Sequence, residues 1–182
     1  MANELSAIWV FWHSLSNKRG NKNDASQNYE AELIPLTEVK TVQQFFCAFS
    51  YLHSISELKK NDCVSFFRKG RKPMWENSPS GGCWIIKIAK KEALKADFYW
   101  ETFVIECMRG EFSQDIDGVL VTVKVYEITF QVWMHEAAAS HTKVAEEIKN
   151  ALRLPKLEMY LKYHKDSIED LSTFRNSVLI TC

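Results

Sequence analysis

The sequence predicts a single α+β domain with a largely antiparallel β-sheet. Three segments carry apolar residues at helical spacing, and they are scattered among short segments that have the character of β-strands. The connections between these segments are tight, which favours hairpin pairing within one sheet. The chain has 182 residues, 46% of them hydrophobic, which is enough to bury one core, and no linker divides it. We therefore treat residues 1–182 as one domain.

The first third of the chain predicts two strands, a loop and a helix. Apolar residues share one helical face from Val42 to Leu52, and Thr41 with Gln44 forms a capping box where this helix begins. The segments before it are a strand at residues 7–14 (AIWVFWHS), an exposed polar loop at 15–28 and a second strand at 29–36 (YEAELIPL).

Two further helices and five further strands are predicted after it. In the second helix, Trp100, Val104 and Met108 repeat at intervals of four. The third helix runs from a Ser140 cap to a stop at Pro155. The strands are predicted at residues 63–67, 83–88, 118–125, 128–134 and 157–163.

Residues 118–134 predict a β-hairpin whose two faces differ. With a two-residue turn at Tyr126–Glu127, valines and other apolar residues face one another on one side of the hairpin. The other side is polar with an aromatic residue at its rim, which is typical of a ligand-facing surface. The expected pairs are Val121–Val132 on the apolar face, and Lys124–Thr129, Thr122–Gln131 and Leu120–Trp133 on the polar face.

Charge and cysteine content restrict the class of protein. The chain has 23 basic and 23 acidic side chains, whereas a protein that coats DNA or RNA non-specifically is normally basic. The five cysteines are odd in number and widely spaced, and we expect no signal peptide. No apolar run approaches the roughly 18 residues of a membrane span. We expect a soluble, cytoplasmic, monomeric protein that does not bind membranes.

The sequence contains none of the common catalytic or metal-binding motifs. The five histidines show no HExxH or comparable spacing, and no Cys/His cluster is typical of zinc. There is no GxSxG elbow, no GxxxxGK[ST] loop and no GxGxxG loop. The sequence therefore predicts a protein that is not an enzyme, with no metal and no cofactor.

The stretch KPMWENSPSGGCW (residues 72–84) places a tryptophan and a glutamate among turn-forming residues. Trp75 either packs into the core or grips a ligand. Recognition of a cationic purine requires aromatic rings, a carboxylate and a basic group. Trp75 would supply these together with Tyr29, Trp133, Glu76 and Lys124. Two rings stack on a base for about 1–3 kcal/mol, and positive charge on the base adds about 0.5–2 kcal/mol. A carboxylate accepts two hydrogen bonds from the guanine edge, and a lysine can hold phosphate.

Several strings of the sequence, in order, resemble those of a known family. They are WVFW, TVQQFF, FRKGRKPMWEN, GGCWIIKI, GVLVTVKV, LRLP and KYHKDSI, and together they cover the chain from about Leu5 to its C-terminal region. The chain resembles the eukaryotic translation initiation factor 4E family, whose members bind the 7-methylguanosine cap of mRNA. The resemblance implies a curved antiparallel sheet with three helices on its convex face and the cap on the concave face.

The resemblance also implies roles for single residues. Tyr29 and Trp75 match the stacking aromatics, Glu76 the carboxylate that reads guanine, Trp133 the tryptophan at the N7-methyl group, and Lys124 a basic residue at the phosphates. Tyrosine at position 29 is similar to the 4E-homologous branch, which binds caps but more often represses translation. The family often has basic residues where this chain has Cys83 and Thr129, so we expect weaker phosphate contacts and modest affinity.

On the convex face, the family binds a scaffold or repressor protein through a helix with a Tyr-x4-Leu motif. A near-invariant tryptophan of that surface is replaced here by Phe46, which has no indole N–H to donate, so we expect altered partner specificity. The residues that match this surface are Leu5, Val42, Phe46, Glu101 and Val104.

Three functions remain open at this stage. The first is binding of capped mRNA in translation initiation or its regulation, and the second is translational repression of the 4E-homologous type. The third, from another class, is a protein interaction module with weak or no cap binding.

Overall fold

The computed structural model describes residues 3–15, 30–112 and 114–181, and its centre is one eight-stranded antiparallel sheet in the order β2-β1-β3-β5-β6-β4-β7-β8. The predicted α+β class is confirmed. The strands are β1 (Glu4–Leu15), β2 (Ile34–Thr41), β3 (Asp62–Arg68), β4 (Gly82–Ala89), β5 (Ile116–Val123), β6 (Glu127–Met134), β7 (Glu158–Tyr163) and β8 (Val178–Thr181).

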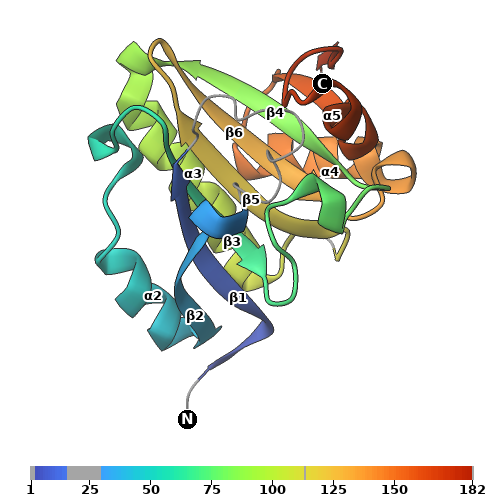
Figure 1. Ribbon diagram of the computed structural model, residues 1–182. Helices are drawn as coiled ribbons and strands as arrows, with labels where there is room; N and C mark the ends of the chain where they lie inside the picture. The colour runs from blue at the N-terminus through green and yellow to red at the C-terminus, as the bar shows by residue number, and fades with distance from the viewer. Residues whose placement is uncertain (1–2, 16–29, 113, 182) are drawn as a thin grey trace.

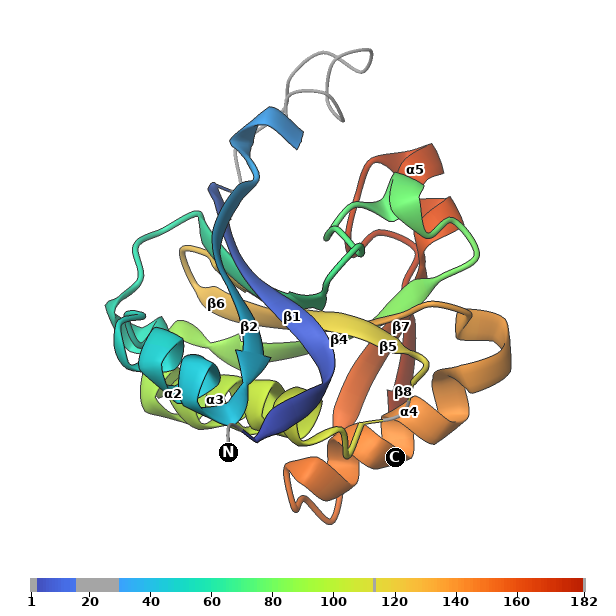
Figure 2. The ribbon, with the colours of Figure 1, turned by 90° about the horizontal axis from the view of Figure 1, so that it is seen from below.

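Three helices cover one face of this curved sheet, which is its convex face. They are α2 (Val42–Ser50), α3 (Ala93–Arg109) and α4 (Ala137–Ala151), and Figure 2 shows them together on the outer side of the curve. On the opposite, concave side lie the short helix α5 (His164–Asp170) and the 3-10 turn η2 (Trp75–Asn77) (Figures 1 and 2). The other 3-10 turns are η1 (Ile55–Glu57) and η3 (Lys90–Glu92).

Alternation along the strands divides the apolar residues between the two faces. The larger set packs beneath the three helices and includes Phe11, Phe66 and Phe130 from the sheet and Phe45 and Phe103 from helices. A smaller set on the other face, which we call the concave cluster, consists of Cys63, Phe67, Cys83, Ile85, Leu120 and Trp133.

Thr41 caps α2 as predicted, but the reciprocal bond of the predicted capping box is absent from the described residues, because the Gln44 side chain bonds to Lys40 and not to the Thr41 N–H. The Gln44 N–H donates to Thr41 Oγ1 over 3.2 Å, and the Gln44 side chain accepts from the Lys40 N–H over 2.9 Å. The predicted Ser140 cap of the third helix is wrong, because α4 begins at Ala137. Ser140 lies in its first turn and donates its hydroxyl to the Glu136 carbonyl over 2.7 Å.

The predicted strand at residues 29–36 is also wrong in its first half. Residues 30–32 form a helical turn, closed by the Leu33 N–H donating to the Glu30 carbonyl over 3.3 Å, and β2 begins only at Ile34. Helix α5 and strand β8 were not predicted. Tyr29 and the predicted loop, except for its first residue Leu15, lie outside the described residues.

The β5–β6 hairpin differs from its predicted register by two residues. Val121 pairs with Phe130, not Val132, and the Lys124 N–H donates to the Glu127 carbonyl over 2.8 Å. The turn therefore consists of Val125 and Tyr126, one residue earlier than expected. Because side chains alternate with period two, an even shift leaves each residue on its predicted face.

Candidate functional site

The loop between β3 and β4 presents Trp75 and Glu76 on the concave side. Both residues lie in η2, the first half-buried and the second exposed. The Trp75 ring packs against the concave cluster, so its inner face is supported by the sheet. The Glu76 carboxylate faces solvent and has no partner among the residues that the structure describes. One turn therefore offers a supported aromatic ring and a carboxylate ready to accept hydrogen bonds.

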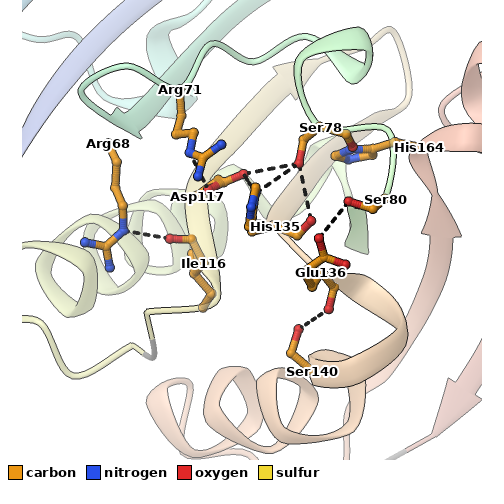
Figure 3. A network of polar contacts seen from close by, with 10 residues as sticks. All are labelled: Arg68, Arg71, Ser78, Ser80, Ile116, Asp117, His135, Glu136, Ser140 and His164. Carbon is orange, nitrogen blue, oxygen red and sulfur yellow. Dashed lines mark hydrogen bonds and ion pairs between the residues drawn. The ribbon is translucent and has the colours of Figure 1, made fainter.

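A buried aspartate anchors this loop to the sheet (Figure 3). Asp117, 4% exposed, receives Arg71 Nε at 3.3 Å, the Ser78 hydroxyl at 3.5 Å and His135 Nδ1 at 3.6 Å. Burial raises the pKa of Asp117, and the positive charges of Arg71 and His135 act against that rise. Arg71 precedes η2 in the chain and Ser78 follows it, so their bonds to Asp117 hold the loop on both sides of η2.

His164, the first residue of α5, holds the same loop from the other side. Its Nδ1 donates to the Ser78 carbonyl over 2.8 Å, and its backbone N–H donates to the Gly81 carbonyl over 3.0 Å. Burial lowers the pKa of His164 to about 4, so the ring is neutral at physiological pH. Its Nε2 is buried and has no hydrogen-bond partner within the described chain.

Gly81 cannot be replaced without moving the loop. A Cβ at this position would meet the Met134 carbonyl oxygen and would lie 2.8 Å from Ser78 Oγ. The chain therefore approaches β6 more closely than any side chain allows, and this approach fixes the distance between the loop and the sheet.

Trp133 forms part of the floor beneath Trp75. It lies on β6 between Cys83 of β4 and Gly118 of β5, and only 3% of it is exposed. Its indole N–H donates to Gln131 Oε1 over 3.1 Å, and its ring centroid lies 4.2 Å from that of His164. Trp75 therefore packs against the cluster to which Trp133 belongs.

Lys124 lies at the end of the hairpin, on the same face as Trp133. Its Nζ pairs with Glu127 over 3.1 Å, and 39% of its side chain is exposed. A second lysine, Lys87 of β4, pairs with the same carboxylate over 3.4 Å. Lys87 was not recognised from the sequence, although its place in the alternating strand CWIIKI was a signal that it faces away from the core.

Cys83 does not supply charge to this face. Its thiol is 1% exposed, and burial raises its pKa to about 12. It contacts Gln131 Oε1 at 3.6 Å. The cysteine therefore acts as a small neutral floor residue, as expected from the absence of a basic side chain there.

The predicted partner surface is formed in part. Phe46 is 52% exposed on α2, Glu101 is exposed on α3, and Leu5 and Val42 are half-buried against the core. A hollow of about 170 Å³ lies between these helices and is lined by Phe49, Leu52, His53, Ser54, Ile55, Asp97, Trp100 and Glu101.

Val104 is not part of that surface. It is fully buried, because one position along a helix rotates a side chain by about 100°, and Ile105 is the half-buried neighbour. The assignment of Val104 to partner contact is therefore wrong.

Neither a metal centre nor a membrane segment is found in the part of the chain that the structure describes. No group of three or more His, Cys, Asp or Glu side chains there could hold a metal ion. No helix there is long and apolar enough to span a membrane.

The fold is that of proteins that have been solved with mRNA cap analogues. An Ascaris suum eIF4E-3, solved in complex with an m2,2,7G cap, aligns with a TM-score of 0.81 and 19% identity over 99% of each chain. A C. elegans eIF4E-3, solved with the 4E-binding protein Mextli and a cap analog, aligns with a TM-score of 0.80 over 98% of this chain and 100% of that one.

Sequence comparison gives the family. The model of eukaryotic initiation factor 4E matches residues 4–179, so the chain belongs to the eukaryotic initiation factor 4E family. The initiation factor NCBP of Oryza sativa subsp. japonica is 29% identical over 96% of this chain and 77% of its own length. The human initiation factor 4E is 27% identical over 97% and 82%. This is a family of translation initiation factors and not of enzymes, in agreement with the sequence prediction.

Proposed function

We propose that this protein binds the 7-methylguanosine cap of mRNA in the cytoplasm and acts in translation initiation or its regulation. The observation that carries the proposal is the β3–β4 loop. It presents a half-buried ring, Trp75, next to Glu76, whose carboxylate is exposed and meets no partner in the described part of the chain, and Asp117 and His164 hold the loop against the sheet. Family membership and the cap-bound relatives support the same function.

Each residue has a physical task in the proposed complex. Trp75 stacks on the methylated base from one side and Tyr29 from the other, and the positive charge of the base adds a cation–π attraction. Glu76 accepts two hydrogen bonds from the N1–H and N2–H edge of guanine, which adenine lacks. Trp133 supports the methyl group from the floor, and Lys124 holds phosphate.

Titration of tryptophan fluorescence with 7-methylguanosine triphosphate tests the proposal. Trp75→Ala removes one stacking partner and should weaken binding by about 1–3 kcal/mol, roughly 5- to 150-fold. Glu76→Gln should weaken binding and reduce the preference for guanine over adenine. Phe46→Ala, which removes an exposed aromatic ring from the convex face, is the matched control and should leave affinity unchanged.

The absence of quenching at millimolar ligand would reject cap binding. The chain would then be an interaction module that kept the fold of its family. Equal affinity of the wild type and Trp75→Ala would place the site elsewhere.

The convex face supports a second role, the docking of a helix with a Tyr-x4-Leu motif. Exposed Phe46 lies on α2, and the hollow beside this helix is lined by apolar side chains such as Leu52 and Trp100 together with polar and charged ones, among them Asp97 and Glu101. An activating scaffold and a repressor would dock in the same place, so the bound partner decides between initiation and repression of the 4E-homologous type. A pull-down with wild type and Phe46→Asp, followed by identification of the proteins lost in the variant, distinguishes the two outcomes.

A further inference from the structure

A carboxylate next to the turn of the β5–β6 hairpin holds two lysines at once. Glu127 Oε1 lies 3.1 Å from Lys124 Nζ, and Glu127 Oε2 lies 3.4 Å from Lys87 Nζ. All three side chains are partly exposed, at 31%, 39% and 26%. Burial raises the pKa of Glu127, but the two lysines outweigh this effect and lower the pKa overall, so the carboxylate is ionised at neutral pH.

These residues lie in one patch of the concave face. Lys87 is the register partner of Thr129, two residues beyond Glu127 on β6, and Thr129 is in turn the partner of Thr122. Thr129 is 3% exposed, and its hydroxyl finds no hydrogen-bond partner in the described structure. An unpaired hydroxyl beside a lysine is a feature that an anionic oxygen would satisfy.

The patch lies at a suitable distance from the proposed base site. Thr129 and Trp133 are four residues apart on the same face of β6, which is about 13 Å along a strand. That distance is comparable with the length of an extended nucleotide. A phosphate chain that leaves a base above Trp133 along this strand first reaches Lys87, the partner of Thr129, and Lys124 lies one cross-strand pair further along, opposite Glu127.

We infer that Lys87 and Lys124 together form the phosphate site of this protein, and that Glu127 determines how much phosphate contributes to binding. This inference rests on the proposed cap-binding function. Many members of the family have a basic residue at the position of Thr129. In this chain, Lys87 of the neighbouring strand β4 supplies that positive charge. Glu127 neutralises one of the two positive charges, so an incoming phosphate competes with a carboxylate that is already in place. Phe174 holds Lys87 in position, with the ammonium 3.3 Å from the centre of its ring.

Glu127→Gln tests the role of the carboxylate, with 7-methylguanosine and its mono-, di- and triphosphates as ligands. The variant frees both ammonium groups, so affinity for the triphosphate should rise by about two- to tenfold, which is the scale of two exposed ion pairs. Affinity for the nucleoside 7-methylguanosine, which carries no phosphate, should not change. The dependence of triphosphate binding on salt should become steeper, because more positive charge is available. Glu127→Asp, which keeps the charge, should stay close to the wild type.

Glu38→Gln is the matched control, because Glu38 also bridges two lysines. Its carboxylate lies 3.1 Å from Lys40 and 2.9 Å from Lys69, on the edge strand β2 and away from the interior strands β4 and β6. The substitution makes the same change in net charge without touching the hairpin. It should leave the affinities for nucleoside and triphosphate unchanged.

Two results would overturn the inference. One is an equal change in nucleoside and triphosphate affinity in Glu127→Gln, which would indicate a structural role, and the other is an equal gain in Glu38→Gln, which would indicate a net-charge effect. Lys87→Gln should reduce triphosphate affinity and spare the nucleoside, and no reduction would remove Lys87 from the site. Failure of the proposed function gives a different result, in which the wild type does not bind the nucleoside at all.

Discussion

Two glycines of the β3–β4 loop should respond to alanine for different physical reasons. Gly70 has φ +87°, and a Cβ there would meet no atom within 4 Å. Gly81 has no positive φ, but its Cβ would meet the Met134 carbonyl oxygen and both oxygens of Ser78, at 2.8 and 2.9 Å for the latter. Gly70→Ala therefore strains the backbone in open space, whereas Gly81→Ala forces two parts of the backbone apart.

Both effects should be large enough to measure, and cap affinity distinguishes them. Gly70→Ala should cost about 1–2 kcal/mol, the penalty of a left-handed conformation for an L-residue. Alanine at position 81 stiffens the unfolded chain, which alone would stabilise the fold by about 0.4–1 kcal/mol. Overpacking of this kind costs about 1–3 kcal/mol, so Gly81→Ala should be destabilising on balance. Because Ser78 and Gly81 carry the bonds that position η2, Gly81→Ala should also weaken cap binding, about tenfold for a shift that spoils the alignment of Glu76.

Urea denaturation and nucleotide titration of both variants separate the two effects. Gly70→Ala should lose stability and keep its cap affinity, and Gly70→Asn should recover part of the stability, because asparagine tolerates the left-handed region. Gly81→Ala should lose both. Unchanged stability and affinity in Gly81→Ala would refute the argument that close approach to β6 positions the loop.

Three other predictions concern His164, the Lys162–Asp170 pair and the convex face. The pKa of His164 is about 4 in the folded protein against 6.5 for a free side chain, so the unfolded state binds the extra proton between these values. The contribution of His164 to the free energy of unfolding should therefore be constant above about pH 6.5 and fall by up to about 3 kcal/mol towards pH 4. In urea denaturation across this range, His164→Asn should show a smaller fall in stability than the wild type. The same dependence of stability on pH in both proteins would contradict the assignment. Lys162 has no exposed side-chain surface and pairs with Asp170 over 2.6 Å. Asp170→Ala removes the counter-charge and leaves the buried ammonium with the Arg175 carbonyl as a hydrogen-bond acceptor, so it should cost about 3 kcal/mol in urea denaturation, whereas Lys162→Met should cost less. The reverse order would contradict this reasoning. Ile105→Glu should weaken binding of a Tyr-x4-Leu peptide, measured by calorimetry, without changing nucleotide affinity, whereas Val104→Glu should unfold the protein, because Val104 is fully buried.

Turn chemistry and side-chain alternation made much of the candidate site predictable. The prolines, glycines and asparagine around Trp75 indicate a loop, and period two places Trp133, Lys124 and Thr129 on one face of the hairpin. That face assignment survived the two-residue error in register, because the error was even.

What the sequence could not provide was contact between distant segments. In the sequence, nothing distinguishes Asp117 from other acidic residues. Its role follows from the fold, which places Arg71, Ser78 and His135 around it. Lys87 is recognised as part of a charged site only once its ion pair with Glu127, on the neighbouring strand, is known. Val104 was assigned wrongly because a helix turns by about 100° per residue, so an error of one position changes the face.

The bonds that hold η2 also have a kinetic consequence. Asp117 and His164 order the loop when the chain folds, so ligand binding does not need to bear the entropy of fixing Trp75 and Glu76. Because this loop is already in place, it should add no slow kinetic phase to the binding of the base. Differences between cap structures, and between variants of the floor residues, should then appear mainly as differences in residence time.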